Sequence, residues 1–184
     1  MTILYDMKKY WFGLLALLAL LPAGSGCKKD TLPSSTTFEV QDSQIVVLPA
    51  GQLLTLGPIA VTSNAPAAYA DHDTDADYVQ QVTPIGGSLT IAGPAGQTFD
   101  ALTGVQVYIS ATPAGQSQLG VGSLPAVAAG TSSLALTPGP TPLDLFVRQP
   151  VYYLFLRLEP YQVLRQPTTL RVTLNYRVRA RIKE

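Results

Sequence analysis

Apolar and polar residues alternate without a break over residues 169–182, near the C-terminal end of the chain. One side carries Leu170, Val172, Leu174, Tyr176, Val178, Ala180 and Ile182, and the other carries Arg171, Thr173, Asn175, Arg177, Arg179 and Arg181. Because strand side chains point alternately to two faces, this period predicts a β-strand with one buried face. A slip of one residue would bury the arginines, so we expect the pairing register to be firmly specified.

Shorter apolar runs, bounded by glycine and proline, predict further strands along the rest of the chain. They cover residues 38–48, 53–61, 79–91, 105–110, 119–124, 133–137, 143–145 and 151–158. Gly57-Pro58 interrupts the second run and predicts an edge or bulged strand, and Gly86-Gly87 allows a bulge in the third. Residues 151–158 are apolar on both faces, as is typical of a strand in the middle of a sheet.

Residues 63–77, in contrast, have the composition of a loop, with Asn64-Ala65-Pro66 as a turn signal. No segment downstream of residue 26 places apolar residues at helical spacing for three turns. We therefore predict an all-β sandwich or barrel of seven to nine strands, with no helix of consequence.

The N-terminal segment has the order of an export signal. Lys8 and Lys9 precede an apolar run over residues 10–21, which is followed by Pro22, small residues and Cys27. The apolar run is too short for a membrane span, which needs about 20 residues. The segment resembles a bacterial lipoprotein signal peptide of the Bacteroidota type. That resemblance implies that Cys27 is acylated and becomes the first residue of the mature chain.

Three parts of the chain follow from this interpretation: a signal peptide over residues 1–26, the acylated Cys27 with a flexible tether over residues 27–37, and one β domain over residues 38–184. Cys27 is the single cysteine, so no internal disulfide can form and no thiol remains for catalysis. Two or more acyl chains would anchor the domain durably to a membrane.

The segment over residues 89–109 carries the pattern Pro-Ala-Gly-Gln-Thr-Phe-Asp-Ala-Leu between two apolar runs, the second of which ends in Val-Gln-Val-Tyr-Ile. Together with the closing Arg-Val-Thr-Leu-Asn-Tyr-Arg-Val-Arg-Ala strand, it resembles β-sandwich lipoproteins of Bacteroidota of unknown function. The resemblance implies a single immunoglobulin-like antiparallel sandwich and brings no catalytic residues.

Charge is distributed unevenly along the mature chain. Residues 27–142 hold two basic and eight acidic residues, whereas residues 143–184 hold eight basic and three acidic ones. The row Arg171, Arg177, Arg179 and Arg181 is a candidate polyanion-binding surface. The alternative is a solvated face, partly paired with acids on a neighbouring strand.

A candidate cation site lies at Asp71, Asp73, Asp75 and Asp77, which alternate with other residues around the single histidine, His72. Hard cations such as calcium prefer several carboxylate oxygens. The complete calcium-loop motif is missing, because Ala76 and Val82 stand where it requires glycine and glutamate. A solvated acidic loop is the alternative, and we predict no zinc or other cofactor.

Sequence motifs for catalysis are absent: the chain contains no G-x-S-x-G and no phosphate-binding glycine loop. Asp100, Asp144 and Glu159 are the carboxylates that a glycoside hydrolase could use, but acids at turns are usually surface groups. The aromatic residues Tyr108, Tyr152, Tyr153, Phe155, Tyr161 and Tyr176 could form a platform for sugars, or could lie in the core.

These observations predict a non-enzymatic binding or structural module in the cell envelope, held at the outer membrane through lipid on Cys27. The domain would face the periplasm or the cell surface, with a glycan or envelope protein as partner and no nucleic acid. The alternative is a glycan-binding accessory of a polysaccharide-uptake system, which an exposed row of aromatic rings would favour.

Overall fold

The structure, a computed structural model, describes residues 34–51 and 54–183. The chain divides into a unit at Met1–Leu32 and a compact unit at Pro33–Glu184. The predicted signal peptide, Cys27 and most of the predicted tether therefore lie outside the described residues.

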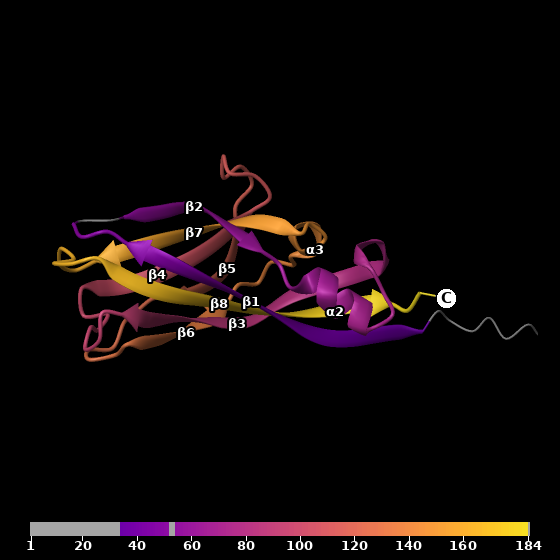
Figure 1. Cartoon of the computed structure of the whole chain (residues 1–184), viewed down its shortest axis with the longest axis horizontal. Helices are drawn as coiled ribbons and strands as arrows, with labels where there is room; N and C mark the ends of the chain where they lie inside the picture. The colour runs from indigo at the N-terminus through magenta and orange to yellow at the C-terminus, as the bar shows by residue number, and fades with distance from the viewer. Residues whose placement is uncertain (1–33, 52–53, 184) are drawn as a thin grey trace, which may run out of the picture. The chain divides into compact units, whose positions relative to one another are not determined.

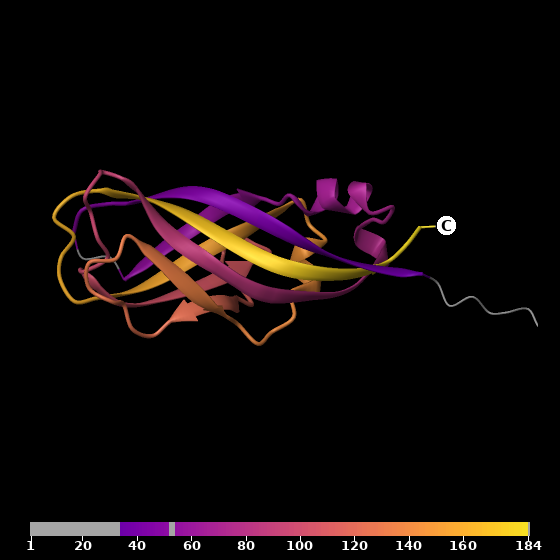
Figure 2. The ribbon, with the colours of Figure 1, turned by 90° about the horizontal axis from the view of Figure 1, so that it is seen from below.

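The described unit is built from eight antiparallel strands in one curled sheet, in the order β1-β8-β3-β6-β5-β4-β7-β2 (Figures 1 and 2). The strands are β1 Ser35–Leu48, β2 Thr55–Thr62, β3 Val79–Gly93, β4 Leu102–Ser110, β5 Leu119–Leu124, β6 Ser133–Pro138, β7 Val151–Pro160 and β8 Thr168–Arg181. The all-β prediction is confirmed, and the strand number lies in the predicted range. The closed, immunoglobulin-like sandwich remains a prediction, because the strands form one continuous sheet.

The curl brings two halves of the sheet around one hydrophobic core. One half is β1-β8-β3-β6 and the other is β5-β4-β7-β2, and a short pairing of Gly122–Ser123 with Thr137–Pro138 joins them. On the other side of the curl the two edge strands, β1 and β2, approach each other without ladder pairing. The fold therefore has one hydrogen-bonded side and one side that side chains must hold together.

β8 alternates as its sequence predicts. Every even-numbered residue from Thr168 to Ala180 is buried, and the four arginines are exposed. The strand pairs along its whole length with β1, from Ser35 opposite Arg181 to Leu48 opposite Thr168, and with β3 on its other edge. Figure 2 shows β8 between these two neighbours.

β7 lies between β4 and β2, as its apolar composition predicts. Its inward residues Leu154, Leu156 and Leu158 are buried, and Phe155 on the opposite face is buried as well. Gly57 of β2 lies against Phe155: a Cβ built at this glycine would come within 2.8 Å of the Phe155 ring. β2 is the bulged edge strand that Gly57-Pro58 predicts.

Three local predictions were wrong. Residues 35–37 belong to β1 rather than to the tether, since they pair with the end of β8. Residues 63–77 contain a helix, α2 (Ala65–Asp71), and a 3₁₀ turn, η1 (Ala76–Tyr78), because Pro66 fits a first helical turn and Tyr69 packs into the core. Residues 144–147 form a short helix, α3 (Asp144–Val147), where we expected an extended piece, because the Asp144 carboxylate accepts a hydrogen bond from the Val82 N–H at 2.6 Å.

Two neighbouring residues of β8 test the alternation directly. Leu170 is fully buried, so Leu170→Ala should lower the free energy of unfolding by about 2–5 kcal/mol. Arg171→Ala, on the exposed face, should change it by no more than about 0.5 kcal/mol. Urea unfolding of the two variants measures both values, and equal losses would contradict the assigned faces.

Candidate functional site

The arginine row lies on the exposed face of β8. Arg177 pairs with Glu39 of β1 at 2.8 Å, and both side chains are more than half exposed. Arg179 and Arg181 follow on the same face, whereas Arg171 lies six residues away, about 20 Å along the strand. The structure therefore brings three of the four arginines together at one end of β8.

The four aspartates of the candidate cation site lie in the segment that contains α2 and η1. Asp75 accepts a hydrogen bond from the Asp77 N–H and pairs with Lys183 at 3.1 Å, and the His72 ring stacks on Phe38 at 4.2 Å between centroids. Among the described residues, no three carboxylate, imidazole or thiol groups lie close enough together to hold a metal ion. The structure thus does not gather the predicted ligands.

This acidic segment lies beside the basic end of β8. The Thr74 hydroxyl donates to the Arg181 carbonyl at 2.7 Å, and the Lys183 N–H donates to the Asp73 carbonyl. The two groups of opposite charge, separated in the sequence, therefore meet in the fold. Exposed ion pairs of this kind contribute between nothing and about 1 kcal/mol each, so their effect is chiefly to offset local charge.

A buried carboxylate, Asp42 of β1, forms a polar cluster that sequence analysis missed. Asp42 is 1% exposed. Its Oδ2 accepts hydrogen bonds from the Tyr176 hydroxyl at 2.7 Å and the Tyr152 hydroxyl at 3.0 Å, and its Oδ1 accepts one from the Asn64 N–H at 2.7 Å. The signal was present in β1, where Asp42 is an acid on the face that also carries Val40 and Val46.

The cluster extends to the start of α2. The Ser63 and Tyr176 hydroxyls lie 2.9 Å apart, and the Ala65 N–H donates to Ser63 Oγ at 3.1 Å. Tyr176 belongs to β8, whereas Tyr152 belongs to β7 in the other half of the sheet. Asp42 therefore connects the two halves on the side of the curl where β1 and β2 do not pair.

Burial keeps the tyrosines of this region protonated. Burial, followed by the negative charge of Asp42, raises the pKa of both Tyr152 and Tyr176. Burial also raises the pKa of the neighbouring Tyr69 to about 12, although the positive charge of Arg148 acts in the opposite direction. At neutral pH these phenols are donors, which suits a structural role better than proton transfer.

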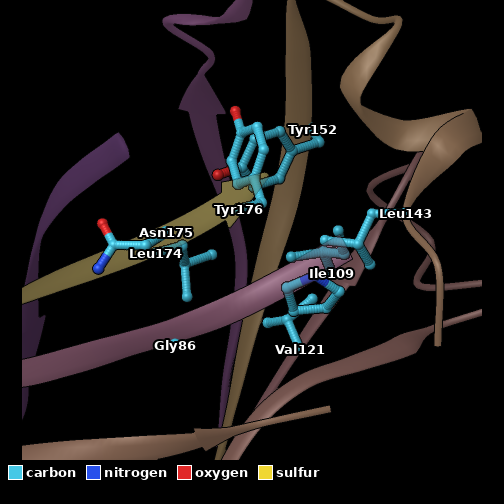
Figure 3. A pocket seen from close by; sticks show the side chains of 9 residues that line it. Gly86, Ile109, Val121, Leu143, Tyr152, Leu174, Asn175 and Tyr176 are labelled. Atoms are coloured by element: carbon cyan, nitrogen blue, oxygen red, sulfur yellow. The ribbon is translucent and has the colours of Figure 1, made fainter. Parts of the chain in front are cut away.

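A small cavity lies next to the cluster (Figure 3). Tyr152 and Tyr176 form part of its wall, together with Ile109, Leu143 and Leu174. Its volume, measured for the centre of a water molecule, is about 10 Å³, and such a space holds about one water. The interior site is therefore too small for an organic ligand.

The aromatic residues divide between core and surface. Tyr152, Phe155 and Tyr176 are buried, Tyr108 and Tyr153 are half-buried, and Tyr161 is 71% exposed. The half-buried Tyr108 ring lies under the guanidinium of Arg157, 4.3 Å from its centroid. Within residues 34–51 and 54–183 there is thus no row of exposed rings.

The exposed Tyr161 borders a surface groove of about 380 Å³, here called the distal groove, which is lined by Asp100, Leu102, Thr103, Pro125, Ala126, Val127, Ala129 and Tyr161. Asp100 accepts a hydrogen bond from the Gly130 N–H at 2.6 Å. This bond, together with one from the Thr98 side chain, lowers the pKa of Asp100. The carboxylate is therefore ionised at neutral pH.

The other two carboxylates considered for hydrolysis have protein partners elsewhere. Asp144 binds the Val82 N–H, and the Glu159 side chain accepts a hydrogen bond from Gln106 at 3.5 Å. Of the three, the distal groove is lined by Asp100. The structure does not line one groove with a pair of these acids.

Comparisons with known proteins yield two weak likenesses. No family model matches the chain, and no curated protein matches it. A crystal structure of FLHE has a TM-score of 0.34 and 15% identity, covering 79% of this chain and 97% of that one. A structure of Desmodium yellow mottle tymovirus has a TM-score of 0.27 and 10% identity, covering 83% and 90%. Neither carries an argument about function. No helix in the described part of the chain is long and apolar enough to cross a membrane.

The Asp42 cluster predicts a ranked mutational series. Asp42→Ala leaves two buried hydroxyls and one N–H without their acceptor, so it should destabilise the domain by about 3 kcal/mol or more. Tyr152→Phe removes one donor and should cost about 1–3 kcal/mol. Glu39→Ala, exposed on the same strand, is the matched control and should stay within about 0.5 kcal/mol. Chemical unfolding gives the values; a loss below about 1 kcal/mol for Asp42→Ala would contradict the structural role.

The raised tyrosine pKa values predict a loss of stability in alkali. Unfolded tyrosine titrates near pH 10, so above that pH the unfolded chain binds fewer protons than the folded one and stability falls. Each buried tyrosine contributes about 1.4 kcal/mol per pH unit, and for Tyr69 this continues to about pH 12. The Tyr152→Phe/Tyr176→Phe variant should show a slope shallower by about 2.7 kcal/mol per unit. Urea unfolding between pH 9 and 11 tests this, and parallel slopes would refute it.

Proposed function

We propose that this protein is a lipid-anchored module of the outer cell envelope, which binds or scaffolds and does not catalyse. The observation that carries the proposal is Cys27, placed after an apolar segment and four small residues or prolines in the order of a lipoprotein signal. The acylated cysteine would hold the chain at the outer membrane, with the domain in the periplasm or on the cell surface.

The start of β1 fits this arrangement. The first strand begins at Ser35, eight residues after Cys27. At a maximum of about 3.5 Å per residue, the connection spans no more than about 28 Å. A module joined in this way would stay close to the membrane surface, with the end of the domain that contains Ser35 nearest to the lipid.

The chemistry of the described carboxylates supports a role other than catalysis. Asp42, Asp75 and Asp144 each accept hydrogen bonds from the backbone or from side chains that hold the fold. Tyr152 and Tyr176 have raised pKa values because of burial and the charge of Asp42, and they donate to that carboxylate. These groups support a rigid scaffold.

One observation favours the second candidate, a glycan-binding accessory of a polysaccharide-uptake system. Tyr161 exposes most of its ring beside the distal groove, where a flat aromatic face can cover the apolar face of a sugar. A single ring suits one sugar unit better than a long chain laid across a sheet.

The anchoring is tested by Cys27→Ser in the full-length protein. The parent should incorporate a fatty-acid analogue and sediment with outer membranes, whereas the variant should remain unlabelled and keep its signal peptide. Cys27→Ser/Ser34→Cys, which moves the thiol by seven residues, is the matched control and should also remain unlabelled. Continued labelling of Cys27→Ser would refute the lipoprotein proposal.

A further inference from the structure

The distal groove lies at the end of the domain away from the start of β1. Its walls come from the segments that follow β5 and β7 and from the start of β4. The register places Thr168 opposite Leu48 and Arg181 opposite Ser35, so the two ends of β8 are separated by about 45 Å. In Figure 1 the connection from β7 to β8 lies at the left, opposite the C-terminal end. We propose that this groove binds the terminal sugar of a neutral glycan.

Tyr161 provides the stacking surface. Its side chain is 71% exposed, which is unusual for a large ring in a domain that buries Tyr152 and Tyr176. Its backbone is held in place, because the Tyr161 N–H donates to the Ala101 carbonyl at 2.7 Å. A fixed, exposed ring loses little conformational freedom when a ligand packs on it.

The rest of the groove offers the mixture of surfaces that a pyranose presents. Leu102, Pro125 and Val127 are apolar, while Asp100 and Thr103 carry oxygen atoms. The Thr103 hydroxyl donates to the Glu159 carbonyl at 3.0 Å, so its oxygen can still accept a hydrogen bond. An ionised carboxylate and this oxygen suit the hydroxyl groups at the edge of a sugar ring.

Charge and size restrict the ligand. The lining residues include one acid and no base, so an anionic sugar would be repelled rather than bound. The volume of about 380 Å³ lies in the lower part of the range for small-molecule sites. A neutral sugar at the end of a chain fits both limits.

The loops around the groove are already connected by backbone hydrogen bonds. The Val127 N–H donates to the Thr103 carbonyl at 3.0 Å, the Phe99 N–H donates to the Thr131 carbonyl at 2.8 Å, and Gly130 binds the Asp100 carboxylate. The walls are therefore positioned before a ligand arrives, which lowers the entropy cost of binding.

The groove beside Tyr108 is the weaker candidate. It is open and contains the small residues Gly120 and Gly122, but the Tyr108 ring lies against Arg157 and its hydroxyl donates to Gln106 at 2.6 Å. A sugar would have to displace the guanidinium to stack there. The ring of Tyr161 needs no such displacement.

The inference rests on the proposed function, because it gives the envelope module a ligand on the end away from its anchor. The test uses the full-length protein in mild detergent on a printed array of neutral glycans that end in glucose, galactose, mannose, xylose or fucose. The strongest glycan is then titrated by calorimetry, with a heparin oligosaccharide as the anionic comparison. We expect at least one neutral glycan to bind and heparin to bind more weakly.

Three variants assign the binding to the distal groove. Tyr161→Ala should weaken the dissociation constant about tenfold or more, and Tyr161→Phe, which keeps the ring, should stay within about threefold. Tyr78→Ala, at the other end of the domain, is the matched control and should bind like the parent. An unchanged unfolding midpoint shows that each variant is folded.

The proposal is overturned if no neutral glycan binds, if heparin binds best, or if Tyr161→Ala binds like the parent. Loss of binding in Tyr161→Phe would assign the effect to the hydroxyl and overturn the stacking. Fatty-acid labelling at Cys27 is unaffected by these variants, so failure of the sugar site and failure of lipid anchoring are separate results.

Discussion

The burial of one carboxylate, Asp42, constrains how this sheet can curl. A buried charge without partners costs several kcal/mol, and Asp42 has three donors from three separate elements: β7, β8 and the residue before α2. All three reach it in a geometry that brings the two halves of the sheet together where β1 and β2 lack ladder pairing. On the opposite side of the curl, the β5–β6 pairing connects the same halves through the backbone. We infer that these two connections, one polar and one backbone, hold the core closed.

The same constraint separates the interior from the functional surfaces. The neutral phenols and the small adjacent cavity leave no room for a ligand inside, so any binding has to use the exterior. The end at Ser35 is occupied by α2, η1 and the paired charges of Arg177, Glu39, Asp75 and Lys183. The other end has the distal groove and Tyr161. This polarity agrees with a module that is anchored at one end and presents a binding surface at the other, which is the arrangement that we propose.

The fold also gives a simpler meaning to the uneven charge of the chain. The basic C-terminal part and the acidic middle part are far apart in sequence, yet the register of β8 with β1 and the contacts of Lys183 place them side by side. Local neutralisation of this kind reduces the attraction that an arginine row alone would exert on a polyanion. Asymmetry along a sequence is therefore weak evidence for a charged surface in a protein whose terminal strand is central in its sheet.

The sequence by itself determined the strands and their faces, because alternation is a local property that survives in any fold with one buried side. Residues 169–182 show this most clearly, and the interruption at Gly57-Pro58 correctly marked an edge strand for the same local reason. The lipoprotein signal at Cys27 is equally local, although it lies outside the described residues. The sequence did not determine the short helices α2 and α3, because seven or four residues carry too little periodicity and their stability comes from Tyr69 and Asp144 contacting distant strands. Nor could it identify the Asp42 cluster or the distal groove. Both are assembled from residues that are separated by tens of positions, and the curl of the sheet alone decides which of those residues meet.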